Sequence, residues 1–138
     1  MAKVNMTTDL NVAPQQVWDL IGGFNTLPDW HPAVEKSELT EEGSTRRLSL
    51  VGGGTIVEKL IKKSDDERVY SYTIEDSPLP VANYTSTISV KDDGKGNARV
   101  EWSSEFNAEG ASETDAVEVI KGIYQAGFDN LNKIFGGK

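Results

Sequence analysis

Apolar and polar residues alternate at the start of the chain. Within residues 3–12 the apolar side chains recur at nearly every second position, which predicts a strand with one buried face. Pro14 suits the first turn of a helix because its missing N–H needs no partner there, and Gly22-Gly23 is a typical helix end. Two prolines within residues 25–32 allow only a short further helical turn. We therefore expect one strand followed by two short helices.

The pattern from residue 34 to residue 107 is again typical of strands. Turn-forming residues interrupt it, notably at Gly52-Gly53-Gly54, Ser77-Pro78-Leu79-Pro80 and Asp92-Asp93-Gly94. This spacing predicts six strands that are joined mostly as hairpins.

Helical spacing replaces the alternation in residues 113–135, where apolar residues recur every three or four positions. Ser112, with Asp115 three residues later, resembles a capping box, and Gly136-Gly137 predicts the end of the helix. At about 1.5 Å per residue this helix is roughly 35 Å long, which is enough to cross a small domain.

Together these elements predict an α+β fold. We expect a curved, seven-stranded antiparallel sheet around the long C-terminal helix, with two short helices between the first two strands. The 138 residues match the common size of one domain, so residues 1–138 are expected to form a single domain.

Composition narrows the choice of partners. The 22 acidic residues exceed the 14 basic ones and give a net charge of -8, which repels nucleic acids and anionic lipid surfaces. With no cysteine and one histidine, neither a disulfide nor a metal site is expected, and no motif predicts a cofactor. No stretch is long enough to span a membrane and the start lacks a signal-peptide pattern, so we expect a cytoplasmic protein.

The inward faces of the predicted strands combine aromatic and polar side chains. Alternation places Tyr72, Tyr84, Ser86 and Ser104 on these faces, beside large apolar residues. A closely packed core avoids polar groups that it cannot pair, whereas a ligand pocket uses a few of them. We therefore expect an internal cavity.

The long helix contains two interior glycines, Gly122 and Gly127, each of which costs up to about 1 kcal/mol relative to alanine. Room for a ligand would explain them, and so would close approach of the sheet to the helix. We expect the rim of the cavity at Trp30-His31-Pro32 and at the loop of residues 77–80.

The residues expected to bind a ligand share an inward position and an aromatic ring or a hydroxyl group. They are Trp30, Tyr72, Tyr84, Ser86, Trp102, Ser104, Phe106, Tyr124 and Phe128.

Glu58 is the first candidate catalytic residue. Its strand can turn either Glu58 or Lys59 inward, and the cost of burying the lysine favours Glu58 slightly. Burial would raise the pKa of this carboxyl toward the range of a general acid or base. Alternatively, Glu58 is exposed, or is buried and paired with Arg46 or Lys36.

Two further features have simpler interpretations. His31 is the second candidate catalytic residue, although a turn histidine bonded to the backbone is the simpler interpretation. The doublets Arg46-Arg47 and Lys62-Lys63 are most simply part of a solvated outer face.

Several segments resemble the SRPBCC superfamily, which includes START lipid-transfer domains, birch-pollen-allergen-like proteins and polyketide cyclase/dehydrase-like proteins. The similarity is sharpest in residues 17–34, which contain Leu27-Pro28-Asp29-Trp30-His31-Pro32, and in residues 77–90. The small polyketide cyclase/dehydrase-like proteins look most similar, and the element order matches over essentially the whole chain. The resemblance implies a helix-grip fold, the fold that the pattern predicts, and a cavity for an apolar ligand.

Three functions remain open at this point. The leading expectation is binding or transport of a small hydrophobic molecule of lipid, polyketide or aromatic type. The second is a polyketide cyclase or dehydratase that uses Glu58 with a tyrosine or His31 in support, although no motif assigns a reaction. The third is an adaptor whose acidic surface contacts another protein.

Overall fold

The computed structural model describes residues 1–40 and 43–136, and this part of the chain follows the predicted element order. The elements are β1 (Ala2–Leu10), α1 (Pro14–Ile21), α2 (Leu27–Trp30), β2 (Val34–Thr40), β3 (Thr45–Leu50), β4 (Thr55–Ser64), β5 (Val69–Asp76), β6 (Val81–Asp92), β7 (Ala98–Ala108) and α3 (Glu113–Phe135).

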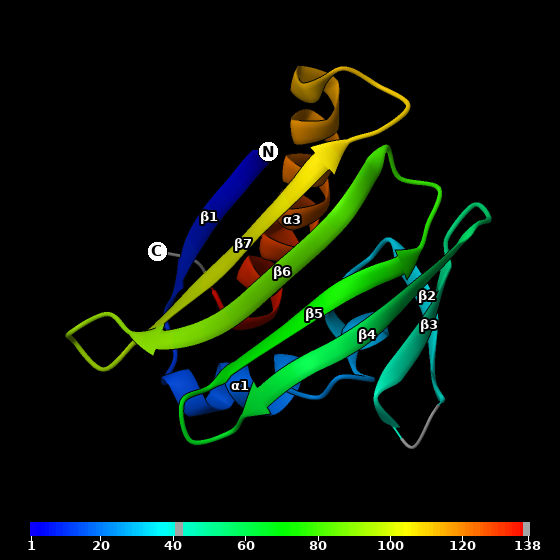
Figure 1. Ribbon diagram of the computed structural model, residues 1–138. Helices are drawn as coiled ribbons and strands as arrows, with labels where there is room; N and C mark the ends of the chain where they lie inside the picture. The colour runs from blue at the N-terminus through cyan, green and yellow to red at the C-terminus, as the bar shows by residue number, and fades with distance from the viewer. Residues whose placement is uncertain (41–42, 137–138) are drawn as a thin grey trace.

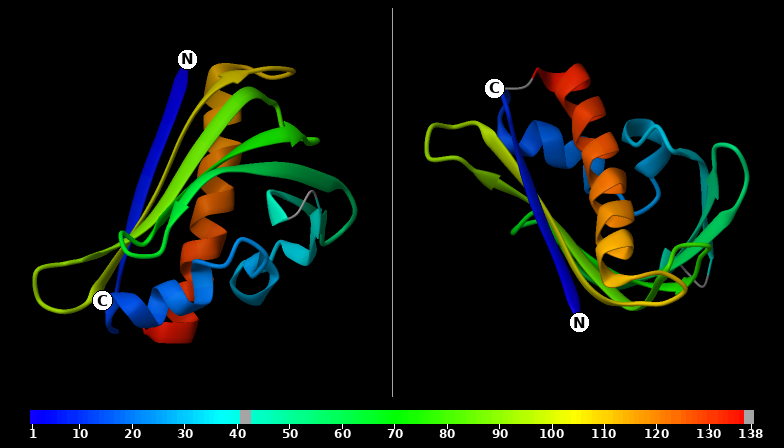
Figure 2. Two further views of the ribbon diagram at one scale, coloured as in Figure 1. Left: turned by 60° about the horizontal axis from the view of Figure 1, so that its bottom comes forward. Right: turned by 90° about the horizontal axis from the view of Figure 1, so that it is seen from above.

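The described strands form one antiparallel sheet of seven strands in the order β1-β7-β6-β5-β4-β3-β2 (Figure 1). β1 and β2 therefore lie at opposite edges, and α1 and α2 carry the chain from one edge to the other. α3 lies in the concave side of the curved sheet, and the two short helices lie at one end of it (Figure 2). The predicted helix-grip architecture is confirmed.

The sheet bends where its strand pairing changes register. Shifts occur between Val57 and Glu58 on β4, and between Ala82 and Thr85 on β6. Asn83, inside the second interval, has a left-handed backbone with φ of 54°. Such bulges increase the local twist and bend a strand, which helps the sheet to curve around α3.

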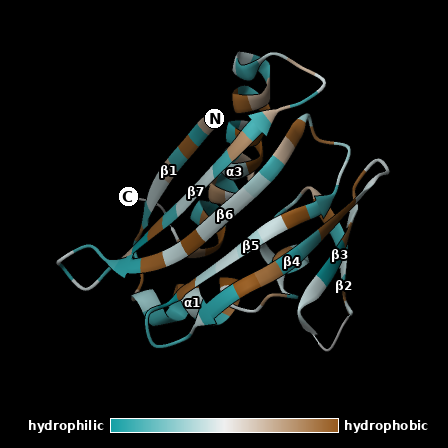
Figure 3. Cartoon of the chain, in the orientation of Figure 1, coloured by the Kyte–Doolittle hydropathy of each residue, from teal (hydrophilic) through white to brown (hydrophobic). Residues whose placement is uncertain are grey.

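The strand faces are those that alternation predicts. On β6 and β7 nearly every second side chain is buried, and most residues between them are more exposed. Apolar and polar bands accordingly follow one another along these strands (Figure 3). The buried face of the two strands carries Tyr84, Ser86, Ile88, Val90, Val100, Trp102, Ser104 and Phe106.

α3 begins and ends as its sequence predicts. Ser112 Oγ accepts a hydrogen bond from the backbone N–H of Asp115 at 3.1 Å, and acidic residues in the first turn complement the helix dipole. Gly136, with φ of 79°, follows the last turn. The expected contribution of Gly137 lies outside the described residues.

The expectation that Arg46 lies on the solvated outer face is wrong. Arg46 is 1% exposed, whereas its neighbour Arg47 faces solvent. Consecutive residues of a strand point to opposite faces, and Arg46 shares the inward face of β3 with Leu48. A charged partner, described below, offsets the cost of burying the guanidinium.

Among the helices of the described residues, none has both the length and the apolar character needed to cross a membrane.

Candidate functional site

A cavity of about 270 Å³ lies between the concave face of the sheet and the N-terminal half of α3. Its walls are mainly apolar and come from α2, from α3 and from strands β2 to β7. The apolar lining includes Leu48, Ile56, Ile74, Val119, Ile120 and Ile123. A concave, apolar site with a few polar groups is the usual form of a small-molecule site.

Apolar side chains also surround the mouth of the cavity. Val51 in the β3–β4 turn is 63% exposed, and Val119 on α3 is 39% exposed. Leu79, from the loop of residues 77–80, also lines the cavity. The other predicted part of the rim is wrong, because Trp30 and His31 are buried, at 1% and 2% exposure. The turn beyond Val51 consists of residues 52–54, three glycines that all have positive φ angles between 88° and 104°. This turn therefore has a backbone conformation that suits glycine.

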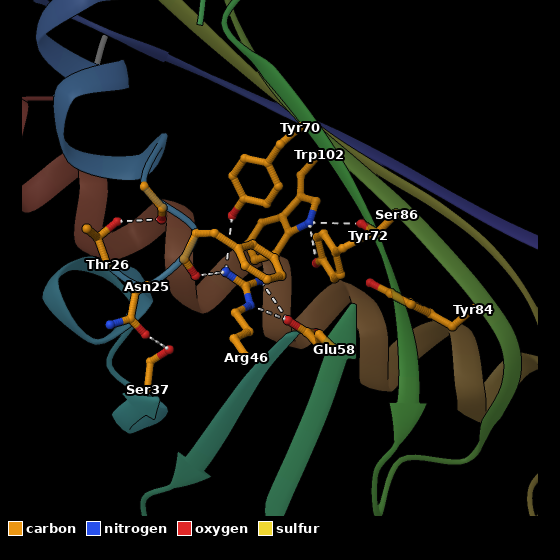
Figure 4. Close-up of polar contacts among 12 residues, drawn as sticks. Asn25, Thr26, Ser37, Arg46, Glu58, Tyr70, Tyr72, Tyr84, Ser86 and Trp102 are labelled. Carbon is orange, nitrogen blue, oxygen red and sulfur yellow. Dashed lines mark hydrogen bonds and ion pairs between the residues drawn. The ribbon is translucent and has the colours of Figure 1, made fainter. Parts of the chain in front are cut away.

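A buried ion pair closes the inner side of the cavity. Arg46 and Glu58 are direct cross-strand partners on β3 and β4, and their side chains are 1% and 7% exposed. Arg46 Nε donates to Glu58 Oε1 at 2.7 Å, and Nη2 lies 2.6 Å from the same oxygen (Figure 4). Both contacts therefore converge on Oε1, and within the described residues Oε2 accepts no hydrogen bond.

Several groups besides Glu58 hold the guanidinium of Arg46 in place. Its Nη1 donates to the backbone carbonyl of Phe24 at 2.8 Å. Its central carbon lies 4.2 Å from the ring centre of Phe24 and 5.0 Å from that of Tyr72, within the range of cation–π attraction. Glu58 and Tyr72 line the cavity, whereas Arg46 is not among the described lining residues.

Burial raises the pKa of the Glu58 carboxyl above its ordinary value, and the positive charge of Arg46 opposes this rise. Burial lowers the pKa of Arg46, but the negative charge of Glu58 reverses that effect and raises it overall. The guanidinium therefore remains charged at every pH at which the protein is folded.

Three hydroxyl groups beside the cavity form a directed chain of hydrogen bonds. Ser86 Oγ donates its hydrogen to the backbone carbonyl of Ser103 at 2.9 Å. It can therefore only accept from the Tyr124 hydroxyl, which lies 3.1 Å away. Tyr124, whose hydrogen is thus used, must accept from the Tyr84 hydroxyl that it contacts. The hydrogens run from Tyr84 to Tyr124 to Ser86, and the oxygen of Tyr84 can only accept from a further group.

Tyr72 is bonded differently. Trp102 Nε1 donates both to the Tyr72 hydroxyl and to Ser86 Oγ, each at 3.1 Å (Figure 4). The Tyr72 oxygen is thus an acceptor, and its own hydrogen has no acceptor among the described residues. Burial raises the pKa values of the Tyr72, Tyr84 and Tyr124 hydroxyls, so all three remain protonated near neutral pH.

Both ring nitrogens of His31 are bonded to the backbone. Nε2 lies 2.7 Å from the carbonyl oxygen of Ile123 on α3, and because a carbonyl can only accept, Nε2 carries the hydrogen. Nδ1 accepts from the N–H of Ala33 at 3.2 Å. Burial lowers the pKa of His31, although the bond to Ile123 opposes this shift. The ring therefore links α3 to the segment after α2 in its neutral form.

The two interior glycines of α3 have different surroundings. A Cβ atom at Gly127 would lie 2.9 Å from the ring of Trp30 and 3.0 Å from the ring of His31. Gly127 therefore allows close approach, the second of the two explanations considered. Gly122 is exposed and has no neighbouring atom within 4 Å of such a Cβ, so neither explanation applies to it.

The structure places the predicted site residues in two groups. The first group lines the cavity and consists of His31, Glu58, Tyr72, Tyr84, Trp102 and Tyr124. The second group is buried outside the lining and consists of Trp30, Ser86, Ser104, Phe106 and Phe128.

Several members of the second group support the first. The rings of Trp30 and Phe128 lie 5.5 Å and 6.2 Å from that of Trp102, and Phe106 stacks on Tyr84 at 5.9 Å. The hydroxyl of Ser104 lies near Tyr124 without a hydrogen bond of normal geometry.

Sequence reasoning placed Arg46 on the outer face, but it also offered a buried Glu58 paired with Arg46 as an alternative, and the structure shows that pair. It missed the apolar side of α3 at Val119 and Ile123. The signal for Arg46 was its alternation with Leu48 on the same strand. For α3, the sequence shows that Val119 and Ile123 each directly precede a buried residue of the apolar stripe. They make this stripe wider than a helix needs to pack on the sheet alone, which could have indicated a second apolar contact.

Comparisons with known proteins agree with this geometry. Residues 1–136 match the family described as polyketide cyclase/dehydrase and lipid transport. The protein XoxI from Bacillus cereus is 43% identical, the match covers 98% of this chain and 96% of that one, and the TM-score is 0.95. An uncharacterised protein from Bacillus thuringiensis is 42% identical over 97% of this chain and 98% of its own, with a TM-score of 0.94.

A more distant structure shares the fold alone. The Zhui aromatase/cyclase from Streptomyces sp. R1128 is 17% identical, with 94% of this chain and 90% of that chain covered and a TM-score of 0.76. A search of curated proteins found no match. A START superfamily protein from Mycobacterium smegmatis, 11% identical with a TM-score of 0.71, likewise shares the fold. Because the family match spans nearly the whole sequence, the chain belongs to the polyketide cyclase/dehydrase and lipid transport family, in agreement with its resemblance to the SRPBCC superfamily.

Proposed function

We propose that the protein binds or carries a small, mainly apolar molecule in the cavity between the sheet and α3. The observation that carries this proposal is the cavity itself, which has apolar walls and opens at an apolar mouth. Exposed apolar residues that gather at one opening are typical of a binding site rather than of an ordinary surface. The family description, which includes lipid transport, supports the same class of function.

The volume of the cavity limits the size of the ligand. Drug-sized ligands occupy pockets of about 300–1,000 Å³, and an apolar cavity of about 150 Å³ in another protein holds benzene. A cavity of about 270 Å³ therefore suits a molecule of roughly two fused rings, or a short acyl chain. A long-chain lipid would extend out through the mouth.

Two measurements test the proposal. Native mass spectrometry of the purified protein, followed by denaturing extraction, shows whether a small molecule is bound. Titration with the neutral apolar dye N-phenyl-1-naphthylamine should show saturable fluorescence that naphthalene displaces.

Substitutions on α3 locate the binding. Ile123→Trp should fill the mouth and weaken dye binding at least about tenfold, the cost of roughly 1.4 kcal/mol of lost binding energy. Ile134→Trp is the matched control, because Ile134 lies on the same helix, is 46% exposed and does not line the cavity. Equal binding by the two variants would show that the dye binds elsewhere.

A second candidate function is acid–base catalysis on the bound molecule. The observation that favours it is the Glu58 carboxyl, which is buried, borders the cavity and has one oxygen with no partner among the described residues. In this candidate Glu58 exchanges the proton, and Tyr72 supplies the hydrogen-bond donor. His31 has no free ring nitrogen for this role in the described geometry.

The chemical fate of an extracted ligand separates these candidates. A carrier returns its ligand unchanged, whereas an enzyme converts it, and Glu58→Gln would then reduce turnover by about a hundredfold or more. Absence of both a copurified ligand and dye binding would favour the third function, an adaptor that contacts another protein.

A further inference from the structure

We infer that the cavity selects a neutral ligand that carries a hydroxyl group and rejects carboxylates, because Glu58 Oε2 and the Tyr72 O–H form a matched acceptor and donor. This inference rests on the proposed function and specifies the chemistry of the ligand. Most polar groups of the described lining are already hydrogen-bonded to one another or to the backbone. The few donors and acceptors that remain unpaired determine which functional group a ligand must carry.

The acceptor is one oxygen of a carboxylate that its own partner orients. Arg46 places both of its contacts on Oε1, at 2.7 Å and 2.6 Å, so Oε2 is left without a partner among the described residues. The guanidinium is fixed by the Phe24 carbonyl and by the aromatic rings around it, so it does not reach into the cavity to meet a ligand. Arg46 is therefore a positioning residue for Glu58.

The donor is the Tyr72 hydroxyl. Its oxygen already accepts from Trp102 Nε1, so only its hydrogen is available to a ligand. Glu58 pairs with Ile74 across β4 and β5, and Tyr72 is two residues from Ile74 on the same face. Diagonal neighbours of this kind are within reach of long side chains, and both residues line the cavity.

No other hydroxyl or imidazole in the described lining supplies a hydrogen. Those of Tyr84 and Tyr124 are used in the chain that ends at the Ser103 carbonyl. The single hydrogen of the neutral His31 ring is directed to the Ile123 carbonyl. The lining thus offers one free donor, on Tyr72, and acceptors on Glu58 and on the oxygen of Tyr84.

Only some functional groups satisfy this arrangement. A neutral hydroxyl has one hydrogen and an accepting oxygen, so a phenol, an enol or an alcohol can donate to Oε2 and accept from Tyr72 at the same time. A ketone has no hydrogen for Oε2. A carboxylate has none either and would place a second negative charge near Glu58 in a buried site, where like charges repel strongly.

Three ligands of the same skeleton test this inference: naphthalene, 2-naphthol and 2-naphthoate. Calorimetry at pH 7, with protein titrated into the sparingly soluble ligands, should give 2-naphthol a dissociation constant at least about tenfold lower than that of naphthalene, the scale of one or two net hydrogen bonds. 2-Naphthoate should bind at least about tenfold more weakly than naphthalene, because of its charge.

A pair of variants assigns the preference to Tyr72. Tyr72→Phe should remove most of the advantage of 2-naphthol and leave naphthalene binding within about twofold, because Trp102 Nε1 keeps its bond to Ser86. Tyr70→Phe is the matched control: Tyr70 lies two residues away, is equally buried and does not line the cavity, and its hydroxyl makes only a long contact of 3.5 Å with Arg46 Nη1. It should keep the full preference for 2-naphthol.

The possible results are distinct. If neither naphthalene nor 2-naphthol binds, the proposed function fails and the inference fails with it. If both bind equally, or if 2-naphthoate binds as well as naphthalene, the proposed function stands and the inference is overturned. Equal loss of preference in Tyr72→Phe and Tyr70→Phe would also overturn it.

Discussion

The substitution Arg46→Met should destabilise the protein by an amount that depends strongly on pH. It removes the cation and keeps an apolar stem, so the Glu58 side chain, 7% exposed, loses its partner in a buried site. The carboxyl then takes up a proton on folding, because burial raises its folded-state pKa and no cation opposes the rise. Stability in this variant is therefore retained below the unfolded-state pKa of about 4.3 and is lost as the pH rises above it.

The size of this effect follows from the cost of protonation. Each pH unit above the ordinary carboxyl pKa of about 4.3 costs roughly 1.4 kcal/mol. In the wild type the two short contacts from Arg46 keep Glu58 ionised over this pH range, so relative to the wild type the expected loss of unfolding free energy is about 4 kcal/mol at pH 7 and about 1 kcal/mol at pH 5.

The reciprocal substitution should behave differently. Glu58→Gln leaves the guanidinium of Arg46 buried without its carboxylate, and a guanidinium cannot lose its proton at these pH values. Its cost should be about 3–5 kcal/mol at both pH 5 and pH 7. The double variant Arg46→Met with Glu58→Gln should recover part of the lost unfolding free energy, because neither member of the buried ion pair is then charged.

Urea unfolding at pH 5, 6 and 7, followed by tryptophan fluorescence and compared with the wild type at each pH, measures these differences. Arg47→Met is the control, since Arg47 is the exposed neighbour of Arg46 and its loss should change stability by less than about 0.5 kcal/mol. The reasoning is refuted if the cost of Arg46→Met is the same at pH 5 and pH 7, or if it is below about 1 kcal/mol at pH 7.

Two further predictions concern α3 and its contact with His31. Gly127→Ala should lower the unfolding free energy by about 1–3 kcal/mol because its Cβ would meet the Trp30 ring at 2.9 Å, whereas Gly122→Ala, in open space, should raise it by up to about 1 kcal/mol. Thermal unfolding of both variants checks this, and equal effects would contradict it. The single histidine should titrate below its ordinary pKa of about 6.5 by NMR, because burial disfavours its charged form. Stability should then be full above about pH 6.5 and fall by at most about 1.4 kcal/mol per unit below it, and His31→Gln should remove that slope; a midpoint at or above 6.5 would contradict the buried, neutral ring.

The strand faces and the long helix could be predicted because their signals are local. Alternation in β6 and β7 and helical spacing in α3 each need only a short window of sequence. Arg46 shows the limit of prediction from such local patterns. The alternation with Leu48 indicated an inward side chain and its charge indicated an outward one, and only the pairing of β3 with β4 shows that Glu58, twelve residues later, is its partner.

The lining of the cavity could be predicted only in part. Periodicity gives the rotation of α3 about its axis but not its distance from the sheet. At Gly127 the helix lies against aromatic rings that fill the space, so Phe128 and Trp30 are packed core. Nearer its start, at Val119 and Ile123, the helix borders the cavity instead.

The polar groups and the mouth of the cavity belong to different kinds of structure. Glu58 and Tyr72 project from paired strands whose register is fixed by neighbours on both sides, whereas Val51 and Leu79 belong to a turn and a loop. Insertions and substitutions are tolerated far better in such connections than in paired strands. Changes in the β3–β4 turn and in the loop of residues 77–80 can therefore alter the size of the ligand that the cavity admits, both among homologues and in a designed library. The preference for a particular functional group, which depends on the paired strands, would stay the same.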